Sequence, residues 1–140
     1  MTDLLMYLKL IFSVMGGTIM SALGGFDALL TVLIWFVVVD YISGVVLAIK
    51  QAKLNSRVGF IGLLKKAIIF CVIIIAHLLD NLTGFGAIRS MAVLFYISNE
   101  GISILENLGK LDVAYPQKLK DILEQLEDKN EDTKNTKSDN

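Results

Sequence analysis

The sequence predicts an all-α integral membrane protein with four transmembrane helices, or three, followed by an amphipathic helix and a disordered tail. Of its 140 residues, 54% are apolar and only 19% are charged, and the mean hydropathy is +0.63. The charges are also unevenly placed, because residues 1–109 hold only seven of the 13 basic and six of the 14 acidic side chains. A water-soluble domain of that size needs more surface charge.

Four apolar stretches, residues 4–26, 28–49, 67–88 and 90–108, each approach the roughly 20 residues that cross a bilayer as a helix. The second is a strong prediction, because its fourteen Leu, Ile, Val and Phe residues contribute about −4 to −8 kcal/mol to insertion, against about +3 kcal/mol for Asp40. The fourth has eight such residues and a near-central Glu100, so we expect it to cross only with partners.

The first stretch is open to more than one interpretation. It contains Lys9 and four glycines, so it either spans the membrane or lies in the interface, and we favour spanning. A cleaved signal peptide is a weaker alternative, because the chain lacks a positively charged start before the apolar run.

Basic residues set the predicted orientation. Five of them lie between the second and third stretches with no acid among them: Lys50, Lys53, Arg57, Lys65 and Lys66. This connection should be cytoplasmic, with only Arg89 in the outer connection that follows. Four spans place both termini in the cytoplasm, whereas three would move the N-terminus outside.

Residues 110–140 form a separate cytoplasmic tail after the transmembrane domain, residues 1–109. Leu119, Ile122, Leu123 and Leu126 have helical spacing, which predicts a short amphipathic helix over residues 117–127. Residues 128–140 are polar and charged, and we expect them to be disordered.

A polar stripe runs along the last span at three- and four-residue steps, and its members are Tyr96, Asn99, Glu100, Ser103, Glu106, Asn107 and Lys110. A membrane helix with one polar face lines water or faces polar partners in a bundle. We favour the water-lining interpretation, because the stripe is long and carries two acids. A structural hydrogen-bond network inside a sealed bundle is the alternative.

Small residues are the candidates for close helix packing: Ser13, Gly17, Ser21 and Gly25 at four-residue spacing, and Gly44 in the second span. Such residues let helix backbones approach closely in lipid. The first four indicate an oligomerisation seam or, equally, a packing face within one chain.

Three ionisable residues fall within the predicted spans: Asp40, His77 and Asp80. Intramembrane ionisable groups are costly and usually pair internally. We favour helix–helix contacts or cap-like contacts to loop backbone over a proton relay, because there is one histidine and we expect no basic side chain deep in the core.

Several function classes find no support in the sequence. One cysteine, Cys71, and one histidine exclude an internal disulfide and a zinc site built from several such ligands. A net charge of −1 gives no indication of nucleic-acid binding. No phosphate loop, nucleophile motif or metal-ligand cluster is present, so we expect neither an enzyme nor a bound cofactor or metal.

Two segments carry a family resemblance. They are Asp40-Tyr41-Ile42-Ser43-Gly44 with the following basic connection through Gly62-Leu63-Leu64-Lys65-Lys66, and Tyr96-Ile97-Ser98-Asn99-Glu100-Gly101-Ile102-Ser103. In combination they resemble the toxin secretion/phage lysis holin family over about residues 27–126. One departure is visible: a Pro-x-Pro step after the last span is common in that family, and here only Pro116 is present.

The resemblance implies a protein that accumulates in the bacterial cytoplasmic membrane, oligomerises and opens a lesion through which an endolysin or a large toxin leaves. Its partners would be membrane lipids, further copies of itself and the passing cargo. Two alternatives have the same architecture: a narrow ion channel or antiholin-like regulator, and a membrane-anchored protein whose helix over residues 117–127 recruits a partner.

Overall fold

The structure is a computed structural model that describes residues 1–135, and throughout that range it contains helices and connections but no strand. The predicted all-α class is confirmed. The helices are α1 (Thr2–Ala22), α2 (Ala28–Lys50), α3 (Ser56–Thr83), α4 (Ile88–Lys110) and α5 (Gln117–Asn135).

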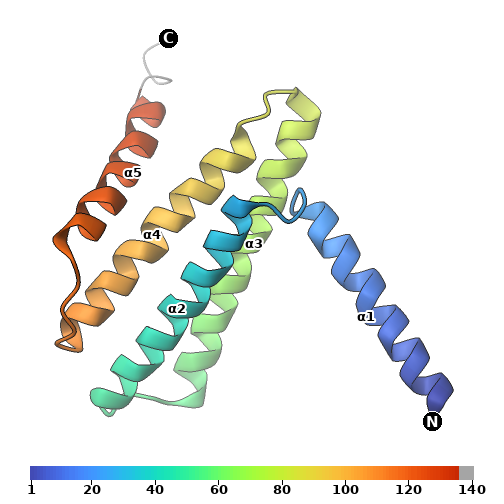
Figure 1. The fold of residues 1–140 in the computed structure, drawn as a ribbon, viewed down its shortest axis with the longest axis horizontal. Coiled ribbons are helices and arrows are strands. Elements are labelled where there is room, and N and C mark those ends of the chain that lie inside the picture. Colours follow the sequence, from blue (N-terminus) through green and yellow to red (C-terminus); the bar gives the residue numbers. More distant parts are fainter. Residues whose placement is uncertain (136–140) are drawn as a thin grey trace.

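Helices α2, α3 and α4 form an antiparallel bundle in which α4 packs against both of the others (Figure 1). The core is made of aliphatic side chains that recur at helical spacing, including Leu30, Leu33, Ile73, Val93 and Ile97. Their burial on one face of each helix follows from the 3.6-residue period. The same faces also carry the polar residues of the candidate site.

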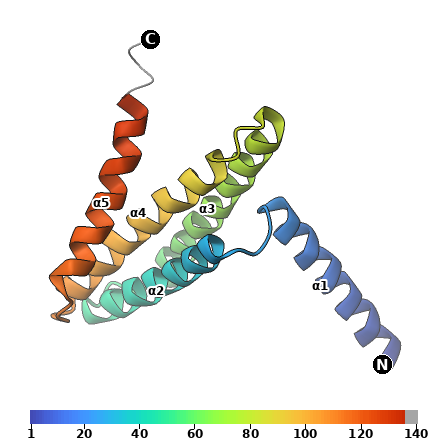
Figure 2. The same cartoon turned by 45° about the horizontal axis from the view of Figure 1, so that its top comes forward.

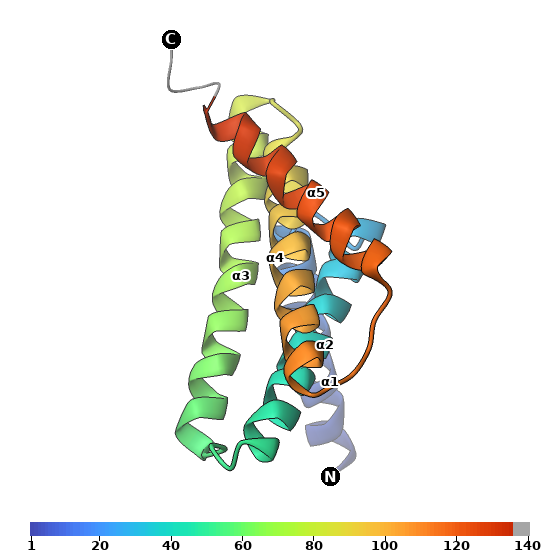
Figure 3. The same ribbon diagram turned by 90° about the vertical axis from the view of Figure 1, so that its left-hand side faces the viewer.

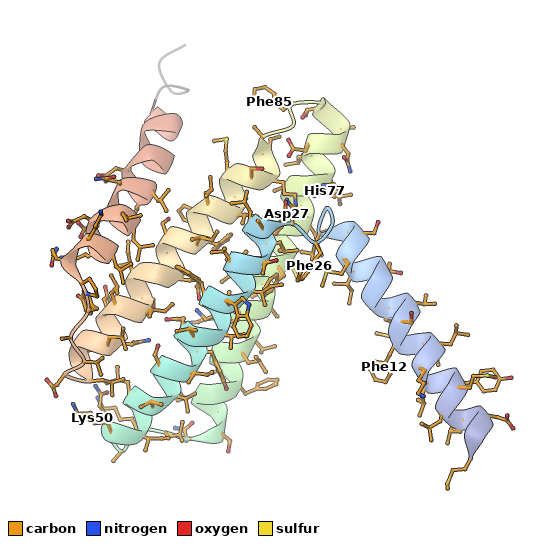
Figure 4. All side chains as sticks on the ribbon, in the orientation of Figure 1. Phe12, Phe26, Asp27, Lys50, His77 and Phe85 are labelled. Atoms are coloured by element: carbon orange, nitrogen blue, oxygen red, sulfur yellow. The ribbon has the colours of Figure 1, made fainter. Side chains whose placement is uncertain are left out.

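Helix α1 projects away from the bundle and touches it only near its C-terminal end (Figure 2). It ends at Ala22, before the predicted limit at residue 26, because Gly24 and Gly25 adopt φ angles of +85° and +89°. These left-handed conformations interrupt the helix and suit glycine. Figure 4 shows the side chains of α1, Phe12 among them, pointing outward along the whole helix.

Within residues 1–135, three helices are long and apolar enough to cross a membrane: Asp3–Ala22, Ala28–Lys50 and Ser56–Thr83. Helix α4 is not among them, because its polar residues lower its hydropathy. Crossing by α4, and therefore the count of four spans, stays a prediction.

Side chains cap the starts of three helices. Asp27 accepts from the Leu30 N–H of α2 at 2.8 Å, and Asn55 accepts from the Val58 N–H of α3 at 2.8 Å. Asp80 reaches across the connection between α3 and α4 and accepts from the N–H groups of Ile88 and Arg89. These caps satisfy amides that lack a partner within their own helices.

Helix α5 turns back along α4, as Figure 3 shows. The predicted helix over residues 117–127 is present, but it continues to Asn135. The expected disorder from residue 128 is therefore wrong as far as residue 135, where the sequence has no Gly or Pro to end the helix. Residues 136–140 of the expected tail lie outside the described residues.

Candidate functional site: a charged cluster inside the helix bundle

One lysine joins all three helices of the bundle. The Lys66 ammonium of α3 forms an ion pair with the Asp40 carboxylate of α2, with Nζ 2.5 Å from Oδ2, and a second ion pair with the Glu100 carboxylate of α4. The side chains of Asp40 and Glu100 are only 8% and 4% exposed. A single cation therefore holds two buried acids from different helices.

Helical spacing brings these groups to one level. Asp40 and Glu100 each lie ten residues before the ends of their helices, at Lys50 and Lys110. At 1.5 Å per residue both carboxylates lie about 15 Å from that end of the bundle. Because α2 and α4 both begin at the opposite end (Figure 1), their equal spacing places the two acids side by side.

A hydrogen-bond network extends the cluster toward that end. The Asn107 amide donates to Asp40 Oδ1 at 3.3 Å and to Ser43 Oγ at 3.0 Å. The Ser43 hydroxyl in turn donates to the Asp40 carbonyl at 3.0 Å. No buried side-chain nitrogen or oxygen among the described residues lacks a partner. The buried polar side chains of α2 and α4 are thus satisfied by protein atoms.

The cluster has a formal charge of −1, from two carboxylates and one ammonium. A buried ion pair gives little net stability, because desolvation offsets the attraction. Removing one member is costly, however, since it leaves an uncompensated buried charge. The cluster therefore fixes the relative register of α2, α3 and α4 rather than simply adding stability.

A cleft of 330 Å³ opens beside the cluster between α2, α3 and α4. Asp40, Lys66 and Asn107 reach its wall together with Ser103 of the predicted polar stripe. Across the cleft the Tyr41 hydroxyl donates to the Gly59 carbonyl at 3.4 Å. The charged groups therefore border open space on one side and the apolar core on the other.

The predicted polar stripe is divided in the single chain. Glu100 is buried, and Ser103 and Asn107 are half-buried beside the cleft. Asn99 and Glu106 are exposed. Tyr96 packs against the core, where its ring meets Phe95 edge to face with a centroid distance of 5.2 Å. A water-lining role for these six residues stays a prediction.

The basic residues predicted for one connection are distributed differently. Lys50 ends α2 and Lys53 lies in the short connection, whereas Arg57, Lys65 and Lys66 lie in α3, which begins at Ser56. Lys65 points outward and Lys66 points into the bundle. The expectation that no basic side chain lies deep in the core is therefore wrong, because two carboxylates compensate the Lys66 charge.

A second polar centre lies at the other end of the bundle, around Arg89. Its guanidinium pairs with Asp27 at 2.7 Å and donates to the carbonyls of Leu23 at 2.5 Å and Gly25 at 3.2 Å. These bonds join the start of α4 to the α1–α2 connection. The Arg89 guanidinium also holds the pKa of the Asp27 carboxyl below its usual value.

Sequence reasoning missed the structural role of Arg89, which it treated as a charge in an outer connection. Two signals were available: Arg89 is a lone arginine between apolar stretches, and Asp27 is a lone acid between two others. Charged side chains that are isolated in apolar sequence tend to form ion pairs with one another. Their 62-residue separation concealed the pairing.

The three predicted intramembrane ionisable residues do not form one site. Asp40 belongs to the Lys66 cluster, whereas Asp80 caps α4, as the favoured cap-like interpretation expected. His77 Nε2 lies 3.2 Å from the Asn81 amide nitrogen. Figure 4 places His77 close to Asp27 at the Arg89 end and far from Lys50 at the other end.

The small-residue candidates contact little within the chain. Ser13, Gly17 and Ser21 are exposed on α1, and a Cβ on Gly17 would meet nothing within 4 Å. Gly25 lies outside the helix, so it is not the fourth member of a helical face. A Cβ on Gly44 would lie 3.7 Å from the Asn107 amide nitrogen, an ordinary contact.

Comparisons with known proteins identify one family and relatives that align with most of the chain. The profile of the bacteriophage holin family matches residues 17–128. An uncharacterised 14.9 kDa protein of Clostridium perfringens is 38% identical over 131 residues, which cover 92% of this chain and 99% of the relative. A probable holin of Bacillus phage phi105 is 39% identical over 103 residues, which cover 73% and 76%. No solved structure matches.

Proposed function

Because this chain belongs to the bacteriophage holin family, we propose that it oligomerises in the bacterial cytoplasmic membrane and opens a lesion there. A cytosolic endolysin, or a large toxin, would leave through the lesion. The observation that supports this proposal is the arrangement of α4, which carries a polar side held inside the bundle by the Lys66 cluster.

The exterior of the chain supports residence in a bilayer. Large apolar side chains are exposed along α1, α2 and α3, for example Phe12, Trp35 and Ile68. Water disfavours such surfaces and hydrocarbon accepts them. The polar groups of the Lys66 cluster are meanwhile paired inside the bundle, which lowers the cost of placing them at membrane depth.

We distinguish two arrangements of the polar side of α4, one in the closed single chain and one in an open assembly. In the closed chain, Glu100 and Asn107 bond to Lys66, Asp40 and Ser43. In an assembly, α4 would separate from α2 and α3, and its polar stripe would face water together with the stripes of neighbouring copies. Tyr96, Asn99, Glu100, Ser103, Glu106 and Asn107 are then the residues that line or seal the opening.

Charge supports the proposed orientation. Lys50, Lys53, Arg57 and Lys65 are exposed near one end of the bundle, and Lys110 lies at the same end of α4. Positive side chains favour the cytoplasmic side, so this end and α5 would be cytoplasmic. With α1 as a span the N-terminus would lie on that side too.

The test is inducible expression in bacteria that carry a folded cytosolic reporter enzyme. Reporter activity in the medium and membrane potential are followed together, and membrane insertion is checked by fractionation. Depolarisation with reporter release is the expected result. Depolarisation without release would favour a narrow ion channel, and neither event in cells with inserted protein would favour an antiholin-like regulator or a partner-binding anchor.

Glu100→Gln tests the role of the stripe. The amide keeps the side-chain shape, and Lys66 keeps Asp40 as its partner, so insertion should be unchanged. We expect a changed onset or extent of release. Asp128→Asn removes one negative charge from an exposed position and is the matched control. Release from the Glu100→Gln variant that matches wild type would argue against a lumenal role for this residue.

A further inference from the structure

Helix α5 covers an apolar groove formed by α2 and α4. Its residues Leu119, Ile122, Leu123 and Leu126 face Phe36 of α2 and the aliphatic side of α4, around an apolar space of 450 Å³. Leu123 is 9% exposed, although it belongs to a helix with a strongly charged outer side. This face of α4 is apolar enough to meet lipid, but in the structure α5 covers it.

A glycine makes this contact close. A Cβ on Gly101 would lie 2.6 Å and 2.8 Å from the two methyl carbons of Leu123 and 3.0 Å from a ring carbon of Phe36. Any other residue at this position would displace Leu123. The missing side chain of Gly101 therefore leaves a notch in the surface of α4, and Leu123 of α5 fills this notch.

The connection before α5 holds it in this position. Residues 111–116 reverse the chain within six residues, and Lys50 of α2 binds Asp112 at 2.7 Å and the Lys110 carbonyl at 3.1 Å. Both contacts are exposed, so they orient the connection more than they stabilise it. The docking of α5 rests mainly on its apolar face.

A surrounding bilayer would oppose this docking. Gly101 lies nine residues from the end of α4, about 14 Å along the helix. The adjacent α2 remains apolar as far as Ile49, so lipid reaches this level when α2 crosses. Lys120, Asp121 and Glu124 on the outer side of α5 are exposed, and hydrocarbon disfavours such side chains by about 3 kcal/mol each at full depth.

We propose that α5 is an autoinhibitory clamp on α4: copies associate and the lesion opens only after Leu123 leaves the Gly101 notch. The docked helix covers the α4 face whose glycine permits close helix contact. Its apolar side favours docking, and its charged side favours release into water at the membrane surface. This inference rests on the proposed lesion where the readout is reporter release. Where the readout is chemical cross-linking, it rests on association between copies.

A reversible cross-link tests the clamp. Gly101→Cys and Leu123→Cys are combined in a Cys71→Ser background, so that the two new thiols are the only ones. The Gly101 Cβ position lies 2.6 Å from a Leu123 methyl carbon, so the two positions face each other directly, as a disulfide between them requires. We expect oxidation to give an intramolecular disulfide in membranes, to reduce chemical cross-linking between copies severalfold, and to delay reporter release. Reductant should restore both.

Substitutions give an independent test without a cross-link. Leu123→Glu should release the clamp, with more cross-linking between copies and earlier reporter release, whereas Gln125→Glu on the exposed side of α5 should match wild type. Gly101→Leu should act in the same direction as Leu123→Glu. Gly109→Leu is its control in the same helix, because a Cβ there meets nothing within 4 Å.

The outcomes separate the clamp from the lesion. Oxidised and reduced protein that form and lose the disulfide, yet associate and release reporter equally while wild type still releases it, would overturn the clamp. If the disulfide does not form, because both substitutions themselves disturb the contact, the Leu123→Glu variant decides, and association and release equal to those of wild type would overturn the clamp. If wild type releases no reporter, the lesion is wrong. Cross-linking between copies then decides the clamp alone: association that rises on reduction and in Leu123→Glu supports it, and unchanged association refutes it.

Discussion

Arg89 Nη1 lies 2.7 Å from Asp27 Oδ2, so the first turn of α4 is bound to the residue that caps α2, 62 positions earlier in the chain. The same guanidinium donates to two carbonyls of the α1–α2 connection. Arg89 is therefore the group through which α1, α2 and α4 meet at this end of the bundle.

Replacing Arg89 should lower the free energy of unfolding, because the contacts between α4 and the α1–α2 connection are lost. Arg89→Gln removes the ion pair and leaves the Leu23 and Gly25 carbonyls short of donors, which should cost about 2–4 kcal/mol. Arg57→Gln is the control, because Arg57 is exposed, and should stay within about 0.5 kcal/mol of wild type. Denaturant unfolding in detergent micelles measures both. Equal stability of the two variants would show that the contacts of Arg89 are energetically neutral.

The Asp27–Arg89 pair should also give a pH dependence. The pKa of Asp27 is lowered, chiefly by its hydrogen bond from Arg89, so ionised Asp27 stabilises the folded chain. This contribution is fully present above the unfolded-state pKa of about 3.9 and is lost as pH falls through the lower folded-state pKa.

The stability difference between wild type and Arg89→Gln should therefore be constant above about pH 5 and should shrink below about pH 4. In an Asp27→Asn background the acid-dependent part of the difference should disappear. Unfolding curves at a series of pH values measure it. A difference that shrinks equally in both backgrounds would assign the pH dependence to another group.

The Lys66 cluster predicts an unequal response to charge removal. Lys66→Met leaves Asp40 and Glu100 as two unpaired buried acids, which should destabilise the bundle by about 3–5 kcal/mol. Lys65→Met removes the same charge from the exposed neighbouring position and should change stability by about 0.5 kcal/mol or less. Thermal unfolding in micelles distinguishes them.

Neutralising the two acids as well shows whether the loss of stability in Lys66→Met comes from unpaired charges. Adding Asp40→Asn and Glu100→Gln to Lys66→Met removes the two unpaired charges, so the triple variant should recover most of the lost stability. No recovery would show that the loss in Lys66→Met does not come from the two unpaired charges.

The helices of this fold were largely predictable, because the long apolar stretches of α2 and α3 are local features of the sequence. The ends of α1, α3 and α5 were less so. Gly24 and Gly25 ended α1 early, α3 begins at Ser56 rather than at residue 67 and ends at Thr83 rather than at residue 88, and no Gly or Pro stopped α5 at residue 127. Apolar and polar composition alone therefore did not locate the ends of these helices.

The partners within the candidate site could not be predicted in the same way. Glu100 and Asp40 were recognised as costly in a membrane, but their shared cation, Lys66, was assigned to a connection because it precedes the third apolar stretch, which begins at residue 67. Only the rotation of α3 decides which of two adjacent lysines enters the bundle. The docking of α5 likewise depends on Gly101, whose missing side chain gives no signal in a hydropathy pattern.

Two adjacent glycines should differ in their tolerance of a methyl group. Gly24 and Gly25 both have positive φ, so alanine is strained at either position. A Cβ on Gly24 would also lie 2.6 Å from Arg89 Nε and 2.8 Å from His77 Nδ1, whereas one on Gly25 meets nothing within 4 Å.

Gly24→Ala should therefore be the more destabilising variant, because Arg89 cannot move without breaking its bonds to Asp27 and Leu23. We expect an excess over Gly25→Ala of about 1–3 kcal/mol, measured by unfolding in micelles. Equal losses would show that the backbone conformation alone accounts for the effect and that Arg89 adjusts freely.

Helix α1 offers a test of association between copies that leaves the single chain untouched. Gly16 and Gly17 are adjacent, and a Cβ on either would meet nothing within 4 Å. Only Gly17 shares a helix face with Ser13 and Ser21 at four-residue spacing. If this face packs against another copy, a large side chain at position 17 would separate the two helices and weaken their contact.

Gly17→Leu should then reduce chemical cross-linking between copies in membranes and delay reporter release, whereas Gly16→Leu should leave both near wild type. Both variants raise the hydropathy of α1 equally, so a change in insertion cannot account for a difference between them. Equal behaviour of the two variants would argue against this face as the contact between copies and would leave α1 as a helix that meets lipid on every side.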